Sequence, residues 1–184
     1  MDHYLEIQVL PDLDISAPAL MNNLFAKFHR VVAQRGCGEV GVSFPNYDKT
    51  LGNLLRLHGT QSSLSHLMSE TWLKGLRDYT KVSEVLAVPS EIKGFRCIGR
   101  IQQKSPQNMR KRSINKGWKT NEEALEILPD SKQKLLDLPY LQIQSLSSKQ
   151  QMRIYIKQGK LQKTASAGTF SSYGLSRITS VPYF

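Results

Sequence analysis

Polar and apolar residues alternate in the segment "HYLEIQVL", which covers residues 3–10. Leu5, Ile7 and Val9 fall on one side of an extended chain, and polar residues occupy the other side. This two-residue period is typical of a strand that buries one face, so we expect a strand here.

The next segment, residues 17–36, repeats its apolar residues at the spacing of a helix. Ser16 and Pro18 are typical of a helix start, and Gly36 is typical of a helix end. The residues expected to form the buried face are Leu20, Leu24, Phe25, Phe28, Val31 and Val32.

Shorter patterns predict the rest of this half. Residues 39–44 and 54–59 have strand-like composition and flank a turn-rich segment. Residues 62–79 have a helical pattern, and residues 82–89 predict a last strand. The order βαββαβ is that of a ferredoxin-like domain, which also underlies many RNA-binding modules.

The second half begins with "FRCIGRIQQ", a strand-like segment at residues 95–103. Ser105 and Pro106 then predict the start of a helix, and Gly117 predicts its end. Thr120 and the glutamate three residues after it form a capping box, which predicts a second short helix.

Two alternating segments, residues 140–147 and 152–159, flank a short polar turn and predict a β-hairpin. We therefore expect an α+β fold with two domains. A ferredoxin-like domain would cover residues 1–92. An α/β domain over residues 93–184 would carry the polar helix that starts at Ser105 and the hairpin.

Positive charge is concentrated in the second half. Residues 1–92 contain 8 Lys and Arg against 10 Asp and Glu, whereas residues 93–184 contain 17 against 5. This asymmetry predicts a basic half that binds a polyanion, with a solvated basic surface as the alternative. The cysteines form no C-x-x-C motif, and we find no signal peptide and no membrane-spanning run, so we expect a cytoplasmic protein without membrane contact.

The helix predicted after Ser105 is almost entirely polar, and only Met109 and Ile114 are available for packing. A helix this short is marginal in water, so we expect an anionic ligand to stabilise it. Nucleic acid fits better than a membrane, because no wide apolar face accompanies the charge. The face expected to contact the ligand consists of Asn108, Lys111, Arg112, Asn115 and Lys116.

RNA is the expected nucleic acid, because the end of a short hairpin stem admits a helix that a long RNA duplex would exclude. A DNA-reading helix-turn-helix protein is the main alternative, but its recognition helix needs an apolar stripe that packs on its own domain. A solvated helix that binds nothing is a third possibility.

The four histidines, His3, His29, His58 and His66, are the acid–base candidates. His29 borders the apolar face of the first predicted helix, where a histidine is more often structural than catalytic. The basic half has no acidic cluster with metal-ligand spacing and no glycine-rich phosphate loop before a helix, so we expect neither a metal nor a cofactor. RNA can be cut without either if the protein aligns a 2′-hydroxyl and moves a proton.

Several segments follow one another in a characteristic order over the full length of the chain. They are "MDHYL", "LFAKFHRVV", "VGVSFP", "WLKGLRDY", "RIQQKS", "QSLS" and "YGLS…VPYF". Through these segments, the whole chain resembles the CRISPR repeat-processing endoribonucleases of type I-F systems.

This resemblance implies a ferredoxin-like N-terminal domain and a basic helix that enters the major groove of a CRISPR-repeat RNA hairpin. It implies metal-independent cleavage of pre-crRNA at the 3′ foot of the stem, by attack of a 2′-hydroxyl that leaves a 2′,3′-cyclic phosphate. The enzyme would stay on the mature crRNA and join the other subunits of a type I-F surveillance complex.

The resemblance also assigns roles to single residues. His29 matches the catalytic histidine, Ser145 the serine that positions the 2′-hydroxyl, and Tyr173 the tyrosine that orients the histidine. Arg100 and Gln102 match a pair that hydrogen-bonds base edges near the foot of the stem. The residues expected to contact RNA are Arg100, Gln102, Lys104, Asn108, Arg110, Lys111, Arg112, Asn115, Lys116, Ser147 and Met152.

Two features depart from the family pattern. Met152 stands where a phenylalanine stacks on the terminal base pair, and a thioether lacks the aromatic face. The basic helix has Asn or Lys at several arginine positions, so its grip on phosphates should be looser. A subunit that binds the hairpin without cutting it, and an unrelated nucleic-acid-binding protein, are the alternative functions.

Overall fold

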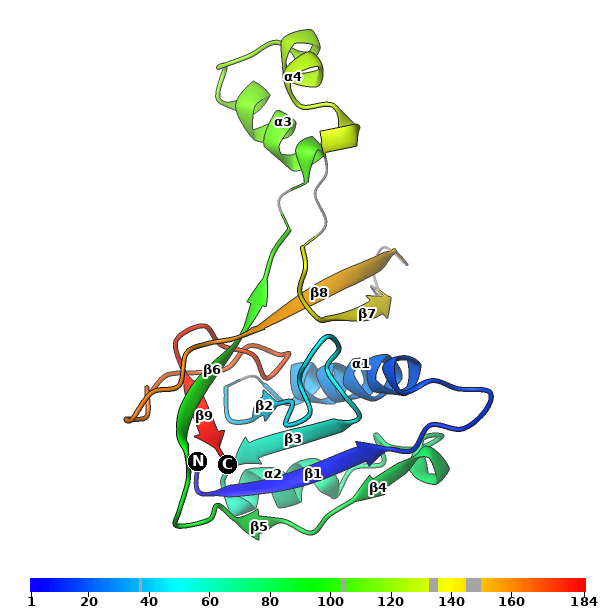
Figure 1. The fold of residues 1–184 in the computed structure, drawn as a ribbon, viewed down its shortest axis with the longest axis vertical. Coiled ribbons are helices and arrows are strands. Elements are labelled where there is room, and N and C mark those ends of the chain that lie inside the picture. The colour runs from blue at the N-terminus through cyan, green and yellow to red at the C-terminus, as the bar shows by residue number, and fades with distance from the viewer. Residues whose placement is uncertain (37, 104, 133–135, 145–149) are drawn as a thin grey trace. The chain divides into compact units, whose positions relative to one another are not determined.

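The chain forms two compact units in a computed structural model (Figure 1). One unit combines residues 1–101 with residues 138–184, and the other consists of residues 102–137. The predicted boundary at residue 92 lies inside the first unit, and the assignment of RNA recognition to the second half stays a prediction. The structure describes residues 1–36, 38–103, 105–132, 136–144 and 150–184.

The first sheet of the larger unit is antiparallel and follows the strand order β2-β3-β1-β4, with β5 also paired to β1. The predicted alternation of the first strand is confirmed, because Leu5, Ile7 and Val9 are fully buried. The strands are β1 (His3–Val9), β2 (Gly41–Ser43), β3 (Leu54–Gly59), β4 (Thr80–Val82) and β5 (Leu86–Ala87).

Helix α1 (Ala17–Arg35) packs its apolar face into the core, as predicted. It begins after Ser16, carries a proline in its first turn and ends at Gly36, where φ is 92°. All six residues predicted for the buried face are buried, and Met21 joins them. The helix therefore presents one edge of its apolar stripe, including the position of His29, beside the core.

The helix predicted over residues 62–79 is wrong in length, because α2 (Gln61–Met68) ends eleven residues earlier. The Ser69 hydroxyl donates to the His66 carbonyl at 2.8 Å, and the Trp72 indole donates to the Leu67 carbonyl at 3.1 Å. These side chains satisfy carbonyls that a longer helix would have used, so the chain turns away. A short 3₁₀ helix, η1 (Arg77–Tyr79), follows.

The single strand predicted over residues 82–89 is also wrong, because it divides into β4 and β5. Residues 83–85 separate them, beginning with Ser83. Its backbone N–H donates to the Glu6 carbonyl at 2.9 Å, and its side-chain hydroxyl accepts from the Glu6 N–H at 2.9 Å. A side chain thus replaces one rung of the ladder, so the regular pairing with β1 is interrupted.

The second sheet of the larger unit is antiparallel, with the order β7-β8-β6-β9. The predicted hairpin is confirmed by the pairing of β7 with β8; the residues that join them, 145–149, lie outside the described chain. Residues 94–97 pair with β9 and residues 98–101 pair with β8. The strands are β6 (Gly94–Ile101), β7 (Tyr140–Gln144), β8 (Gln151–Gln158) and β9 (Ser180–Tyr183).

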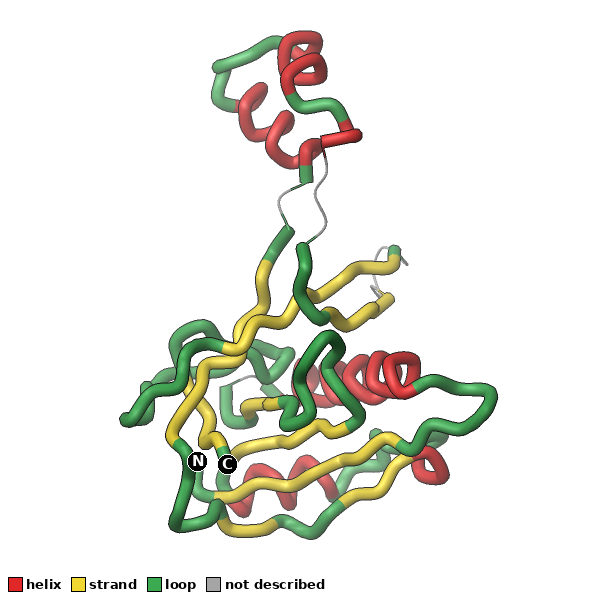
Figure 2. Tube along the Cα trace, viewed as in Figure 1, coloured by secondary structure: helices red, strands yellow, loops and turns green. Residues whose placement is uncertain are grey.

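The two sheets and the two α-helices of the larger unit are drawn in Figure 2. One hydrophobic core joins them. Val42 and Leu55 from the first sheet belong to the same cluster as Ile98 and Ile154 from the second. The final segment also contributes, because Leu175 is buried in it. Segments far apart in sequence are therefore held in fixed positions beside α1.

The smaller unit contains α3 (Pro106–Asn115), α4 (Asn121–Ile127) and the 3₁₀ turn η2 (Asp130–Lys132). The predicted caps are confirmed. The Ser105 hydroxyl accepts from the Asn108 N–H at 3.1 Å, and Thr120 with Glu123 forms the capping box of α4.

The fold is thus α+β, as predicted, with four α-helices and two antiparallel sheets in the described residues. The ferredoxin-like arrangement of the N-terminal part is a finer statement, and it stays a prediction.

Candidate functional site

His29 and Tyr173 stack on each other in the larger unit, although they lie far apart in the sequence. Their ring centroids lie 3.9 Å apart and the ring planes differ by 9°. His29 comes from α1, whereas Tyr173 belongs to the loop that precedes β9. Both side chains are only partly buried, so a ligand can reach them from solvent.

The protonation of the His29 ring follows from its hydrogen bond. Its Nδ1 lies 3.0 Å from the carbonyl oxygen of Ser172. A carbonyl oxygen can only accept, so Nδ1 must carry the proton and donate. In the neutral imidazole, Nε2 then holds the free electron pair. The ring is therefore set up to take a proton at Nε2.

A tight turn over residues 171–175 holds the partners of His29 in place. The Gly174 N–H donates to the Ser171 carbonyl at 2.8 Å, and the Val42 N–H donates to the Gly174 carbonyl at 3.0 Å. Gly174 has a φ of 66°, and a Cβ built on it would lie 2.7 Å from Val42 Cγ1. Only glycine fits both the backbone and the space.

Arg100 extends this stack. Its guanidinium carbon lies 5.6 Å from the centroid of the Tyr173 ring. Its Nε is buried and has no hydrogen-bond partner among the described residues. The structure therefore brings together three predicted site residues, His29, Tyr173 and Arg100, from α1, the C-terminal loop and β6.

Met152 lies on β8, opposite Ile143 of β7 in the strand register. Its side chain is partly buried and packs against the hydrophobic core. The predicted residues Ser145 and Ser147 follow β7 but lie outside the described chain, as does Lys104. Their positions in the site stay predictions.

Helix α3 of the smaller unit carries the predicted basic face. Its side chains are mostly solvent-exposed, and Pro106 is its only buried residue. Met109 is 39% exposed, which agrees with the thin apolar stripe. The exposed residues of the predicted face are Asn108, Lys111, Arg112, Asn115 and Lys116.

Arg110 has a different environment from the rest of α3. Its guanidinium donates to the Leu128 carbonyl and, at 2.7 Å, to the Asp130 carboxylate. Only 13% of the side chain is exposed. Arg110 therefore ties α3 to the segment after α4, and its predicted contact with RNA remains untested.

His58 is a structural histidine rather than a catalytic one. It is fully buried in β3, and its Nε2 lies 2.8 Å from the Ser43 hydroxyl. Burial, with the nearby charge of Arg56, lowers the pKa of His58 to about 3. A ring that is neutral and closed to solvent cannot exchange protons with a substrate, so His58 is structural.

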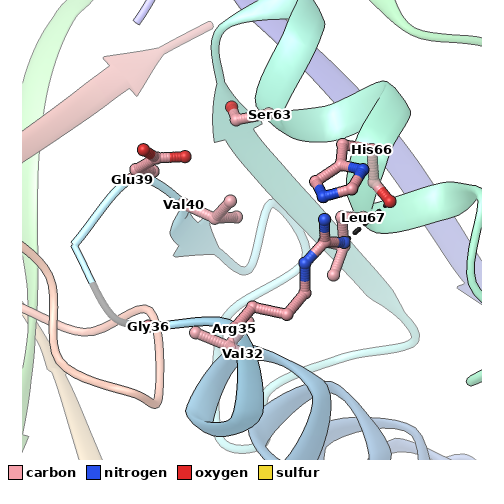
Figure 3. Close-up of a pocket in the computed structure, with 8 residues that line it drawn as sticks. All are labelled: Val32, Arg35, Gly36, Glu39, Val40, Ser63, His66 and Leu67. Atoms are coloured by element: carbon pink, nitrogen blue, oxygen red, sulfur yellow. Dashed lines mark hydrogen bonds between the residues drawn. The ribbon is translucent and has the colours of Figure 1, made fainter.

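A separate hollow of about 320 Å³ lies at the C-terminal end of α1 (Figure 3). Arg35 spans its wall and donates to the His66 carbonyl at 2.7 Å, with Glu70 3.3 Å away. None of the predicted site residues lines this hollow. It therefore does not compete with His29 as the centre of the predicted chemistry.

Comparison with known proteins supplies the family. Residues 4–184 match the family model of the CRISPR-associated protein Cas_Csy4. The chain belongs to this family. It is 50% identical over 185 residues to a protein of Escherichia coli (strain UTI89 / UPEC) named CRISPR-associated endonuclease Cas6/Csy4, with 100% of both chains covered. It is 39% identical over 188 residues to a protein of that name from Pseudomonas aeruginosa (strain UCBPP-PA14), again with 100% of both covered.

Two features of the site were absent from the sequence predictions. One is the Ser172 carbonyl that orients His29, and the other is the Gly174 turn that presents it. Backbone carbonyls leave no signature in a sequence. The glycine after Tyr173 was the available signal, because glycine is favoured where φ is positive.

The described residues contain no group of three or more His, Cys, Asp or Glu that could hold a metal ion. No helix in that part of the chain is long and apolar enough to cross a membrane.

Proposed function

We propose that this protein is an endoribonuclease that binds the hairpin of a CRISPR repeat and cuts pre-crRNA at the 3′ foot of the stem. Membership of the Cas_Csy4 family and two full-length relatives named CRISPR-associated endonucleases support the enzyme class. The stacking of His29 on Tyr173, with Nδ1 bonded to the Ser172 carbonyl, is the observation that carries the proposed chemistry.

His29 acts first as a general base in this proposal. Its Nε2 takes the proton of the 2′-hydroxyl upstream of the scissile phosphate, and the resulting alkoxide attacks the phosphorus. The bond from phosphorus to the 5′-oxygen of the next nucleotide breaks. The upstream product then ends in a 2′,3′-cyclic phosphate, and the downstream product gains a 5′-hydroxyl when a proton is returned to its oxygen.

The other site residues position the reactants. Tyr173 and the Ser172 carbonyl keep the imidazole in one orientation and one tautomer. Ser145 holds the 2′-hydroxyl in line with the phosphorus. Alignment of this kind can supply a large part of a rate enhancement when reacting atoms are held about 3 Å apart.

Recognition of the hairpin is divided between the two units. Arg100 and Gln102 read base edges at the foot of the stem, and Met152 covers the terminal base pair. The α3 face contacts the phosphates through its exposed cations, Lys111, Arg112 and Lys116. Arg110 keeps α3 in place for this contact through its bonds to Leu128 and Asp130.

The ferredoxin-like domain, residues 1–92, is part of the same proposal. It is supported by the strand order, because β3 lies between β1 and β2, as a split βαβ unit would require. Helix α1 follows β1 and helix α2 follows β3, as that fold requires. In this proposal the protein works in the cytoplasm and stays on the mature crRNA as a subunit of a type I-F complex.

The decisive experiment uses a type I-F repeat RNA in EDTA, beside a copy with one 2′-deoxy substitution upstream of the scissile phosphate. We expect cleavage of the first RNA and binding without cleavage of the second. Cleavage of the deoxy copy, or a requirement for Mg²⁺, would refute the 2′-hydroxyl mechanism. Binding of both RNAs without cleavage of either would indicate the binding-only subunit instead.

A further inference from the structure

Trp118 is a large aromatic side chain that the smaller unit leaves in solvent. It follows the end of α3, and 69% of its surface is exposed. Tryptophan is usually well buried, because exposure of its ring to water is costly. An exposed tryptophan beside a nucleic-acid-binding helix therefore calls for a partner.

The position of Trp118 is set by the cap of α3. The Gly117 N–H donates to the Ile114 carbonyl at 2.9 Å, and the Trp118 N–H donates to the Ser113 carbonyl at 3.0 Å. Gly117 has a φ of 67°. These bonds form a Schellman motif, so the backbone of Trp118 is held by the helix itself.

The ring borders the basic face of α3. The ammonium of Lys116, which belongs to that face, lies 4.4 Å from the centroid of the Trp118 ring. An ammonium covers at most one side of an indole, and the large exposed fraction leaves the ring accessible to a second group. Lys119 adds a cation on the other side in sequence. An exposed aromatic ring next to a cation suits a nucleobase together with its phosphate.

A protein partner fits the surroundings of the Trp118 ring less well. The exposed apolar residues Leu125 and Ile127 belong to α4, whereas the residues that flank the ring in sequence are Gly117 and two lysines. A cation against an aromatic ring favours an anionic partner. RNA meets this requirement, and the proposed function already brings it to α3.

The length of α3 indicates which part of the RNA the ring meets. Gln102, proposed to read the foot of the stem, precedes the helix, and Trp118 follows it. Ten helical residues span about 15 Å. Because Gln102 is proposed to read the foot of the stem, Trp118 at the other end of α3 would meet a part of the RNA farther from the foot, where unpaired loop bases are free to stack on aromatic side chains.

We propose that Trp118 stacks on an unpaired base at the loop end of the repeat hairpin and so contributes to substrate selection. This inference rests on the proposed function, because it requires that α3 binds the hairpin. The loop would be recognised by stacking rather than by hydrogen bonds. The identity of the loop base would therefore matter less than its presence.

Fluorescence tests this inference without changing Trp118. The chain has two tryptophans, and Trp72 is partly buried against Phe28. In a Trp72→Phe protein, Trp118 is the sole indole. Titration with the type I-F repeat hairpin should quench its emission. The same hairpin with abasic loop nucleotides should bind with little quenching. Equal quenching by the two RNAs would overturn the proposal.

Affinity provides an independent test. Trp118→Ala should weaken binding of the intact hairpin about tenfold, and Trp118→Phe should retain most of it. The matched control is Leu125→Ala, which removes a side chain that is 55% exposed on α4 and should change nothing. With abasic-loop RNA, Trp118→Ala and the unmodified protein should bind alike. The same tenfold loss on abasic RNA, or no loss on intact RNA, would contradict stacking.

Cleavage separates the two proposals. If the protein neither binds nor cuts the repeat RNA, the proposed function fails. If it cuts the RNA in EDTA and Trp118→Ala binds it as tightly as the unmodified protein, only the role of Trp118 fails.

Discussion

The rings of His29 and Tyr173 lie parallel to within 9°, with 3.9 Å between their centroids. The same turn that supplies Tyr173 also supplies the carbonyl that accepts a hydrogen bond from the His29 Nδ1–H. One loop therefore fixes both the plane and the tautomer of the imidazole. Fixing the plane and the tautomer of the imidazole does not require the Tyr173 hydroxyl.

Replacement of Tyr173 tests this division of roles. Tyr173→Phe keeps the stacked ring, so it should keep a kcat near that of the unmodified protein. Tyr173→Ala leaves the imidazole unsupported and should lower kcat about 10- to 100-fold, because misplacement of a catalytic group is costly. Single-turnover cleavage of repeat RNA measures both. If Tyr173→Phe is as slow as Tyr173→Ala, the hydroxyl has a role that stacking does not explain.

His29→Ala should lower the single-turnover rate by about 100- to 10,000-fold, the range that a general acid–base catalyst contributes. Binding of the hairpin should change little, because in the proposed mechanism His29 moves a proton and does not hold the RNA. Gel-shift titration measures the affinity. His66→Ala is the matched control, since His66 is an exposed histidine on α2. A parallel loss of affinity in His29→Ala would show that the residue is structural.

Gly174→Ala should destabilise the protein and slow cleavage together. The alanine would adopt an unfavourable positive φ and press its Cβ against Val42, at a cost of about 2 to 5 kcal/mol. Gly75→Ala is the control, because Gly75 has a φ of 79° but no atom within 4 Å of its Cβ position. It should cost only about 1 kcal/mol and leave cleavage intact. If urea unfolding shows the same loss of stability in Gly174→Ala and Gly75→Ala, the steric argument fails.

His58 should make the protein less stable in acid. Its folded pKa is about 3, below the ordinary value near 6.5, so between these values only the unfolded chain binds the proton. Stability is therefore complete above about pH 6.5 and falls by about 1.4 kcal/mol per unit as the pH drops towards 3. Urea unfolding of the unmodified protein and His58→Gln between pH 7 and pH 4.5 should reveal a difference of about 2 to 3 kcal/mol in this loss. If the stability of the two proteins falls equally with pH, His58 is not the cause of the loss.

Lys111→Ala should weaken hairpin binding and reduce the slope of log affinity against log salt by about 1, because the variant would lose one proposed phosphate contact. Lys81→Ala, at an exposed position on β4, is the control and should leave the slope unchanged. An unchanged slope in Lys111→Ala would remove this residue from the phosphate contacts of α3.

Local patterns in the sequence determined most of the secondary structure. The alternation around Ile7, the apolar stripe through Phe28 and the caps at Ser105 and Thr120 predicted elements that the structure contains. These signals are local, because a strand period, a helical stripe or a cap depends on residues within a few positions of one another. The errors occurred where side chains intervened, at Ser83 and at Trp72.

The site depended on information that no local pattern contains. The sequence by itself placed His29 at the edge of a helix and, through the family resemblance, named Tyr173 as its partner. Only the tertiary structure decided that the Ser172 carbonyl accepts from Nδ1, which leaves Nε2 as the proton acceptor. A contact across 143 residues arises from the packing of the C-terminal loop on α1 through a common core, and that packing is a property of the whole fold.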